Sequence, residues 1–277
     1  MSHPMIDSSD PLVADLLAGT IELTREAGGY VAPSTVFIER AGQLSIESSA
    51  PDGEPLLRIP RAAFVRVDGV AFCADGDRIV IAEVPEDCGD LEWELLYLQV
   101  ALHNACNKLA WMRRTHPSLD PGLPDDLIAA VRVVVPSFRS PELDAIDLLW
   151  ANRCFRIPMT DQSAPERVLI PLVDLLNHHA KGAVGGWNGR DFEVSARLPF
   201  GTAQCALDYG MDRDPLEMAI VYGFADTSNE INAGRAYDID ALERIIALAS
   251  TQDAPKSAES LRDSAAMIVR GTTNSAE

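Results

Sequence analysis

Three short segments of the chain carry side chains that could bind and orient a polar ligand. Asn177 and His178 close an apolar run that starts at Leu169, which places an amide and an imidazole at the edge of a core. Tyr209 and Tyr222 are each followed by glycine, so two phenolic hydroxyls could reach one pocket while the adjacent backbone comes close to a substrate. Each feature alone also fits a structural role, because Asn-His pairs often cap elements or satisfy a core, and Tyr-Gly is common in turns.

The order of these segments along the chain is more specific than any one of them. The joint pattern is Pro171-Leu-Val-Asp174-Leu-Leu-Asn177-His178, then Tyr209-Gly210, then Glu217, then Tyr222-Gly223-Phe224. It resembles the SET domain, in the branch that includes Rubisco large-subunit lysine methyltransferase and the actin-histidine methyltransferase. Trp150 to Pro158 and Leu56 to Arg61 also resemble the segments that lead into the family's motifs, and the resemblance spans about residues 28–229.

The resemblance implies an enzyme that uses S-adenosylmethionine (SAM) to methylate a lysine or histidine nitrogen of a protein or peptide. Asn177 and His178 would hold SAM, and Arg153 would approach its carboxylate, which suits a guanidinium fork. Tyr222 would line the methyl-transfer channel, and Tyr209 would help to shape it. Catalysis would consist mainly of aligning a neutral nitrogen with the sulfonium methyl group, and desolvation in the channel would favour the neutral form of a lysine.

The sequence departs from the family pattern at three places. Where the family has an early Gly-x-Gly whose backbone follows the cofactor, this chain has Ala41-Gly42-Gln43, so only the middle residue, Gly42, is left as a glycine contact to SAM. The asparagine expected before Glu217 is replaced within Asp214-Pro215-Leu216, and only about 50 residues follow Phe224 in place of a large helical lobe.

These departures leave two alternatives beside the leading hypothesis. One is a catalytically inactive SET-like protein that binds or assembles with a partner. The other is a methyltransferase for a small amine or a biosynthetic peptide. Titration with SAM separates the first alternative from the rest, and a substrate screen separates the second.

Composition and charge limit the kinds of partner that the chain is expected to bind. The 277 residues are 47% hydrophobic and 23% charged, an ordinary globular balance, and the formal net charge is −19. That charge argues against nucleic acid and an anionic membrane as partners, and it would attract a basic protein or peptide. The five cysteines contain no CxxC pair, and the polar start has no apolar signal-peptide core. We therefore expect no metal site and a cytoplasmic location. The oligomeric state is left open.

Periodicity and turn residues predict the elements that must position these side chains. Helices are expected at 12–28, 91–114, 125–135, 141–155, 238–250 and 261–269, and strands at 35–38, 43–47, 56–59, 65–72, 79–84, 168–170, 192–196 and 204–207.

This layout favours an α+β fold of short sheets, a SET-domain fold with a helical insertion and a small C-terminal helical segment. No GxGxxG accompanies it, so a Rossmann-type nucleotide site is not supported. We expect a catalytic domain at 28–229, with the insertion at about 86–150, and a helical segment with a frayed tail at 230–277. The strands of 35–84 and 168–208 should pack together, and Arg153, Asn177, His178 and Tyr222 should line one cleft.

Overall fold

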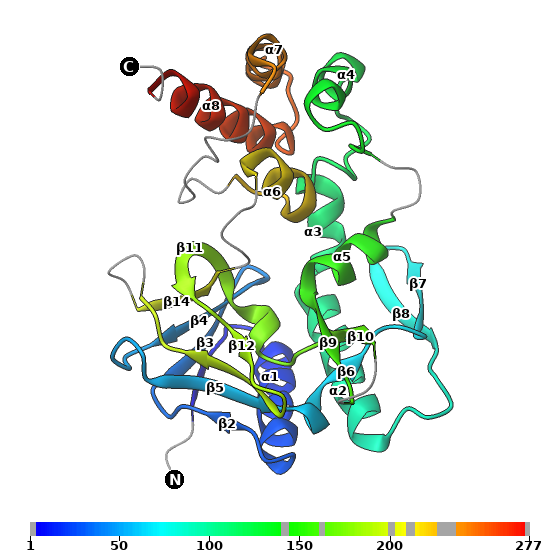
Figure 1. Ribbon diagram of the computed structural model, residues 1–277. Coiled ribbons are helices and arrows are strands. Elements are labelled where there is room, and N and C mark those ends of the chain that lie inside the picture. Colours follow the sequence, from blue (N-terminus) through cyan, green and yellow to red (C-terminus); the bar gives the residue numbers. More distant parts are fainter. Residues whose placement is uncertain are drawn as a thin grey trace. The chain divides into compact units, whose positions relative to one another are not determined.

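The computed structural model describes residues 4–139, 144–160, 164–198, 203–208, 214–225 and 237–274 (Figure 1). The chain divides into two compact units, and each unit is built from two separate stretches of sequence. Unit 1 comprises Met1–Leu109 and Arg153–Tyr209, and unit 2 comprises Ala110–Asn152 and Gly210–Glu277.

Short strands dominate unit 1. Those before the helical stretch are β1 (Met5–Asp7), β2 (Tyr30–Val31), β3 (Thr35–Arg40), β4 (Gln43–Ser48), β5 (Pro55–Pro60), β6 (Val65–Arg66), β7 (Ala71–Asp75) and β8 (Arg78–Glu83). Those after it are β9 (Cys154–Pro158), β10 (Pro165–Leu169), β11 (Asn177–Ala183), β12 (Gly186–Trp187), β13 (Asp191–Ser195) and β14 (Gln204–Leu207). Among the described residues they form four small sheets, in the orders β1-β3-β4-β14-β11, β6-β10-β9, β12-β13-β5-β2 and β7-β8.

Strands from the two halves of the sequence pair with one another, as the sequence predicts. β13 pairs antiparallel with β5, β14 with β4, and β10 with β6. The β5 residues Leu56, Leu57 and Ile59 are fully buried, so this pairing lies at the core of unit 1. The prediction that the strands of 35–84 and 168–208 pack together is confirmed, and so is the α+β class.

Two longer helices, α1 (Pro11–Glu26) and α2 (Asp90–Ala105), pack against each other in unit 1. The start of α1 is set by Asp10, whose carboxylate accepts a hydrogen bond from the Leu12 backbone at 2.9 Å, with proline at the first helical position. Its apolar side chains Val13, Leu17 and Ile21 are buried along one face.

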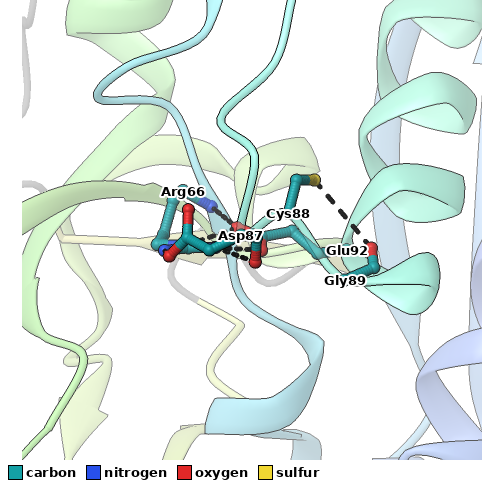
Figure 2. Close-up of polar contacts among 5 residues, drawn as sticks. All are labelled: Arg66, Asp87, Cys88, Gly89 and Glu92. Atoms are coloured by element: carbon teal, nitrogen blue, oxygen red, sulfur yellow. Dashed lines mark hydrogen bonds and ion pairs between the residues drawn. The ribbon is translucent and has the colours of Figure 1, made fainter.

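The start of α2 is fixed to β6 by one arginine (Figure 2). The Arg66 guanidinium donates from Nε and Nη2 to the two carboxylate oxygens of Glu92, at 2.9 and 2.8 Å, and from Nη1 to Asp87 at 2.7 Å. Its backbone NH also donates to Glu92 at 2.8 Å. This fork-to-fork pairing sets the direction in which α2 leaves the sheet.

The described part of unit 2 is helical. It contains α4 (Asp125–Val134), α6 (Pro215–Tyr222), α7 (Ile239–Ala249), α8 (Ala258–Asn274), most of α3 (Lys108–Thr115) and most of α5 (Ala145–Arg153). Helix α7 packs on α4 and α8, and α6 packs on α8. The shared core consists of apolar residues from all four of these helices, including Leu127, Leu216, Leu242, Ile245, Leu261 and Ile268.

Four predicted elements are wrong in extent or type. The expected strand 65–72 is two strands, β6 and β7, separated by residues 67–70. The expected helix 91–114 is two helices, because Asn107 adopts a left-handed φ of 50° between α2 and α3. Residues 154 and 155, expected at the end of a helix, belong to β9, which pairs with β10. Residues 215–222, expected among strands and loops, form α6.

The compact units divide the chain at other positions than 28–229 and 230–277, and those domain boundaries stay predictions. No helix in the described ranges is long and apolar enough to cross a membrane.

Candidate functional site

The segment that carries Asn177 and His178 is anchored by a buried run. All residues from Leu169 to Leu176 are buried. Leu172 adopts a left-handed φ of 69°, and residues Val173–Leu175 form a single 3-10 turn, η2. The chain then enters β11, where Asn177 and His178 pair in parallel with Ala206 and Leu207 of β14. The Asn177 side chain is exposed and that of His178 is half-buried. Both lie where a ligand could reach them.

Arg153 is bonded to this segment from a different part of the chain. Its Nη1 donates to the backbone carbonyl oxygen of Asp174 at 2.5 Å. Asp174 lies three positions before Asn177, so the guanidinium sits beside the turn that leads into β11. The structure thus places Arg153 beside the segment that leads into Asn177 and His178, and the shared role of these residues in binding a cofactor stays a prediction.

Asp174, quoted in the motif but given no role by the sequence, lies at the centre of a buried polar cluster. Burial raises the pKa of its carboxyl to about 6, although Arg153 and the backbone NH groups of Asp174 and Leu172 oppose the rise. His103 of α2 approaches it, with Nε2 3.8 Å from Oδ2. Burial, followed by the charges of Arg153 and Lys108, holds the pKa of His103 well below its ordinary value, so its imidazole is neutral.

Lys108 completes this cluster, and sequence reasoning missed it as a site residue. It is the first residue of α3 and is buried, and its Nζ donates to Oε1 of Gln43 at 3.1 Å. Burial lowers its pKa to about 8; the Arg153 charge adds to this, and Cys106 and Asp174 oppose it. In the sequence, Lys108 falls at a helical spacing, which does not indicate a role in a binding site. The available signal was that this lysine directly follows Asn107, where the helix breaks.

The Ala41-Gly42-Gln43 segment is a tight hairpin. Ala41 and Gly42 connect β3 to β4 with φ values of 50° and 76°, the two positive values that a type I′ turn needs. The Gly42 NH donates to the buried Glu39 carboxylate at 2.7 Å. A Cβ at position 42 would lie 2.7 Å from the Cys106 carbonyl oxygen. Glycine is therefore required here for packing against the end of α2, and a contact of Gly42 with a cofactor stays a prediction.

Tyr222 lies in unit 2, as the last residue of α6, and its ring contacts that of Phe224 with centroids 6.2 Å apart. Gly223 ends the helix in the left-handed conformation, where a Cβ would meet the His116 ring at 2.9 Å. Tyr209 lies outside the described residues. The prediction that Tyr222 shares a cleft with Asn177, His178 and Arg153 stays a prediction.

Asp214, which stands in the altered second motif, has a structural role. Its carboxylate caps α6 by accepting from the backbone of Leu216 and Glu217 at 2.8 and 3.2 Å, and it accepts a hydrogen bond from the Tyr237 hydroxyl. The departure of Asp214–Glu217 from the family pattern thus coincides with the start of a helix.

Two open cavities lie elsewhere. One, of about 410 Å³, is lined within unit 1 by residues of α1 and by Pro4 and Ile6. The other, of about 670 Å³, is lined within unit 2 by residues that include Arg113, Arg114 and Asp120. Neither is lined by the motif residues. Across the described ranges, no three His, Cys, Asp or Glu side chains gather as metal ligands would.

Comparison with known proteins finds similarity to solved structures. No family model matches the chain, and no curated protein matches it significantly. Among solved structures it is similar to the SET domain of LSMT bound to lysine and AdoHcy, with a TM-score of 0.42 and 15% sequence identity. The match covers 78% of this chain and 58% of that one, so it spans less than two thirds of the similar structure. The function proposed below rests on the motif run and on the geometry of this chain.

The chemistry of unit 1 suits the amino-acid end of SAM. That end carries a carboxylate, and the cluster beside Asn177 offers two cations, Arg153 and Lys108. The amide atoms of Gln99, a fully buried residue of α2, have no hydrogen-bond partner within the ranges the structure describes. Buried polar atoms of this kind are normally satisfied by water or by a ligand. The donor set therefore fits the cofactor that the motif run implies.

Proposed function

We propose that this chain is a SET-type methyltransferase that transfers a methyl group from SAM to a lysine or histidine nitrogen of a basic protein or peptide. The observation that carries the proposal is the bond from Arg153 to the Asp174 backbone. It joins the two motif segments that the resemblance assigns to the cofactor, which are 21 positions apart in the sequence.

Each residue has a stated task in this proposal. When bound, SAM supplies a methyl group on a sulfonium centre. Arg153 holds the carboxylate of SAM, and Asn177 and His178 bind SAM at the start of β11. Tyr222 and Tyr209 line the channel in which the acceptor nitrogen is aligned and water is excluded.

The proposed partner and location follow from charge and cysteine chemistry. The net charge of −19 favours encounter with a lysine-bearing basic peptide over nucleic acid or an anionic membrane. All five cysteines are free thiols, which supports a cytoplasmic location.

A second candidate is a SET-like protein without catalysis that serves as a binding partner. The observation in its favour is the hairpin at Ala41 and Gly42, followed by Gln43 in place of a flexible glycine segment. This candidate predicts that the pocket does not take up SAM.

Calorimetry with SAM and S-adenosylhomocysteine tests the proposal. We expect both ligands to bind the wild type, and we expect Arg153→Met to weaken binding about 10- to 100-fold through loss of a charge-assisted contact. Arg156→Met, three positions further along the chain and exposed on β9, is the matched control and should bind like the wild type. Absence of binding to the wild type would favour the second candidate.

The acceptor is tested separately with SAM labelled on its methyl group. Transfer to lysine-bearing basic peptides, lost when the lysine is replaced by arginine, is the expected result. Transfer to free amines alone would indicate a small-molecule methyltransferase.

A further inference from the structure

Two cations of unit 1 lie together beside the motif segment. Lys108 is only 5% exposed, and Arg153 is close enough that its charge opposes protonation of Lys108. They come from separate elements, the start of α3 and the end of α5. Arg153 is bonded to the backbone of η2, and Lys108 to the side chain of Gln43 at the start of β4.

Several ionisable groups lie near these two cations. Asp174 is a carboxylate that stabilises the charged form of Lys108, and Arg153 stabilises the charged form of Asp174. His103 is neutral at ordinary pH, and burial raises the pKa of the neighbouring Cys106 thiol to about 11, so neither contributes charge. Lys108 and Arg153 thus lie together in a largely buried setting, where an anionic ligand group would interact favourably with both cations.

Unsatisfied polar atoms border the same place. Gln99 lies one turn before His103 on α2, so the two side chains share a helix face. In the part of the chain that the structure describes, the Gln99 amide has no hydrogen-bond partner for its side-chain atoms. The cations therefore adjoin polar groups suited to an ordered, hydrogen-bonding ligand.

We infer that Lys108 is a second cofactor-binding residue, which together with Arg153 holds the carboxylate at the amino-acid end of SAM. This inference rests on the proposed function and deepens it. The carboxylate is the anionic group of SAM, so it is the part that two cations would recognise. Gln43, which replaces a family glycine, holds the Lys108 ammonium in place from the hairpin side.

The consequence is a specificity for ligands that carry this carboxylate. S-Adenosylhomocysteine has it, whereas methylthioadenosine has the same adenosine and thioether but lacks the amino-acid end. If Lys108 binds the carboxylate, its removal must weaken the first ligand and leave the second unchanged. A general structural role would weaken both alike.

The experiment is calorimetry at pH 7 with these two ligands on the wild type, Lys108→Met and Arg114→Met. Methionine keeps the length and apolar stem of lysine, and Arg114 is an exposed cation on the same helix that serves as the control. We expect Lys108→Met to weaken S-adenosylhomocysteine about 30-fold and methylthioadenosine less than about twofold. Arg114→Met should bind both like the wild type.

Three outcomes would contradict the inference, and one of them would also contradict the proposed function. If Lys108→Met binds S-adenosylhomocysteine normally, or loses both ligands equally while keeping its circular dichroism, the inference is wrong and the proposed function stands. If the wild type binds neither ligand, the proposed function fails and the inference fails with it.

If Lys108→Met does not fold, the carboxylate can be removed from the ligand instead of the lysine from the protein. The wild type is then titrated with decarboxylated S-adenosylhomocysteine, which keeps the amine and lacks the carboxylate. Binding about 30-fold weaker than that of S-adenosylhomocysteine is expected, and equal binding would overturn the inference.

Discussion

The Arg153 guanidinium donates a hydrogen bond to the Asp174 carbonyl oxygen at 2.5 Å, which ties the end of α5 to the turn before Asn177. One side chain thus links the two segments on which the proposed cofactor site depends. Since the bond is made to backbone, it positions the turn whatever side chain stands at 174. A change in the ionisation of the Asp174 carboxyl can therefore alter the charge of the site without breaking this hydrogen bond.

Cofactor binding should depend on pH through Lys108, whose pKa is about 8. A bound carboxylate favours the protonated form, so the affinity for S-adenosylhomocysteine should be fully present below pH 7 and should fall about tenfold per pH unit above 8. Arg153 and Asp174 are the neighbouring groups whose charges act on Lys108 near pH 8, because the Cys106 thiol, with a pKa of about 11, is still neutral there. Protonation of Asp174 below about pH 6 removes a competing negative charge and should raise the affinity modestly.

Calorimetry from pH 5.5 to 9.5 measures this dependence. The ligand's own amine also titrates, so Lys108→Met is measured over the same range and shows the part that does not come from Lys108. A wild-type curve with the same shape as that of Lys108→Met would contradict the prediction.

Gly42→Ala should destabilise the protein by about 2 kcal/mol or more. The new Cβ would lie 2.7 Å from the Cys106 carbonyl oxygen, and the φ of 76° disfavours any residue with a Cβ. Gly53→Ala is the matched control: its φ is 89°, but nothing lies within 4 Å of its Cβ, so it should cost about 1 kcal/mol from backbone strain alone. Urea unfolding compares the two, and equal losses would show that the Cys106 contact has no effect.

Single glycine substitutions at Ala41 and Gln43 should have different effects, one on stability and the other on cofactor affinity. Ala41→Gly relieves a φ of 50° and should leave cofactor binding intact while raising stability by up to about 1 kcal/mol. Gln43→Gly removes the acceptor of the Lys108 ammonium and should weaken S-adenosylhomocysteine binding several-fold. Tighter binding by Gln43→Gly would instead indicate that the Gln43 side chain obstructs the cofactor.

Tyr222 and Asn177 should affect different steps. Tyr222→Phe should slow methyl transfer about 10- to 100-fold while changing SAM binding little, because the hydroxyl acts on alignment at the transition state. Asn177→Ala should weaken SAM binding. Single-turnover rates and calorimetry on the two variants separate these effects, and unchanged transfer by Tyr222→Phe would remove Tyr222 from the mechanism.

His116 should make unit 2 less stable in acid. Its Nδ1 accepts from the Ser118 NH at 3.2 Å and its Nε2 lies 2.9 Å from the Val221 carbonyl oxygen, an arrangement that the neutral ring satisfies. Burial lowers its pKa to about 4, against 6.5 when exposed. The unfolded chain therefore binds more protons between these values, so this contribution to stability is present above pH 6.5 and is lost as pH falls.

The measurement is urea unfolding of the wild type and His116→Gln at pH 7.5 and pH 5. Glutamine retains a donor for Val221 and does not titrate. The wild type should lose about 2 kcal/mol more than the variant between the two pH values. The raised pKa of Asp174 acts in the opposite direction, but it is present in both proteins and cancels in the difference. Equal losses would argue against a neutral, buried His116.

Local patterns were sufficient to predict much of unit 1. The alternating residues of 35–38 and 43–47 and the apolar Leu56-Leu57 run became β3, β4 and β5, and 204–207 became β14 with the same bounds. These segments are strongly periodic, and their partners are set by which faces must be buried.

The misses have local physical causes. The break at Asn107 depends on one left-handed residue inside an otherwise helical pattern, which periodicity does not register. Helix α6 had signals that could have been used, with Asp214 as cap, Pro215 at the first position and Gly223 after the end. The same segment also resembles a SET motif, and that resemblance favours no helix there. Lys108 could not be assigned, since its role depends on contacts with Gln43 and Arg153, which are distant in the sequence.

The discontinuous build of unit 1 has a consequence for synthesis on the ribosome. Strands β4 and β5 emerge early, but their partners β14 and β13 are made only after the whole helical stretch α2 to α5. Until then the two strands present unpaired backbone edges, the kind of surface that aggregates or engages chaperones. The pairings that close the core are also of high contact order and therefore slow to form. The core of unit 1 can therefore be completed only after β13 and β14 have been made.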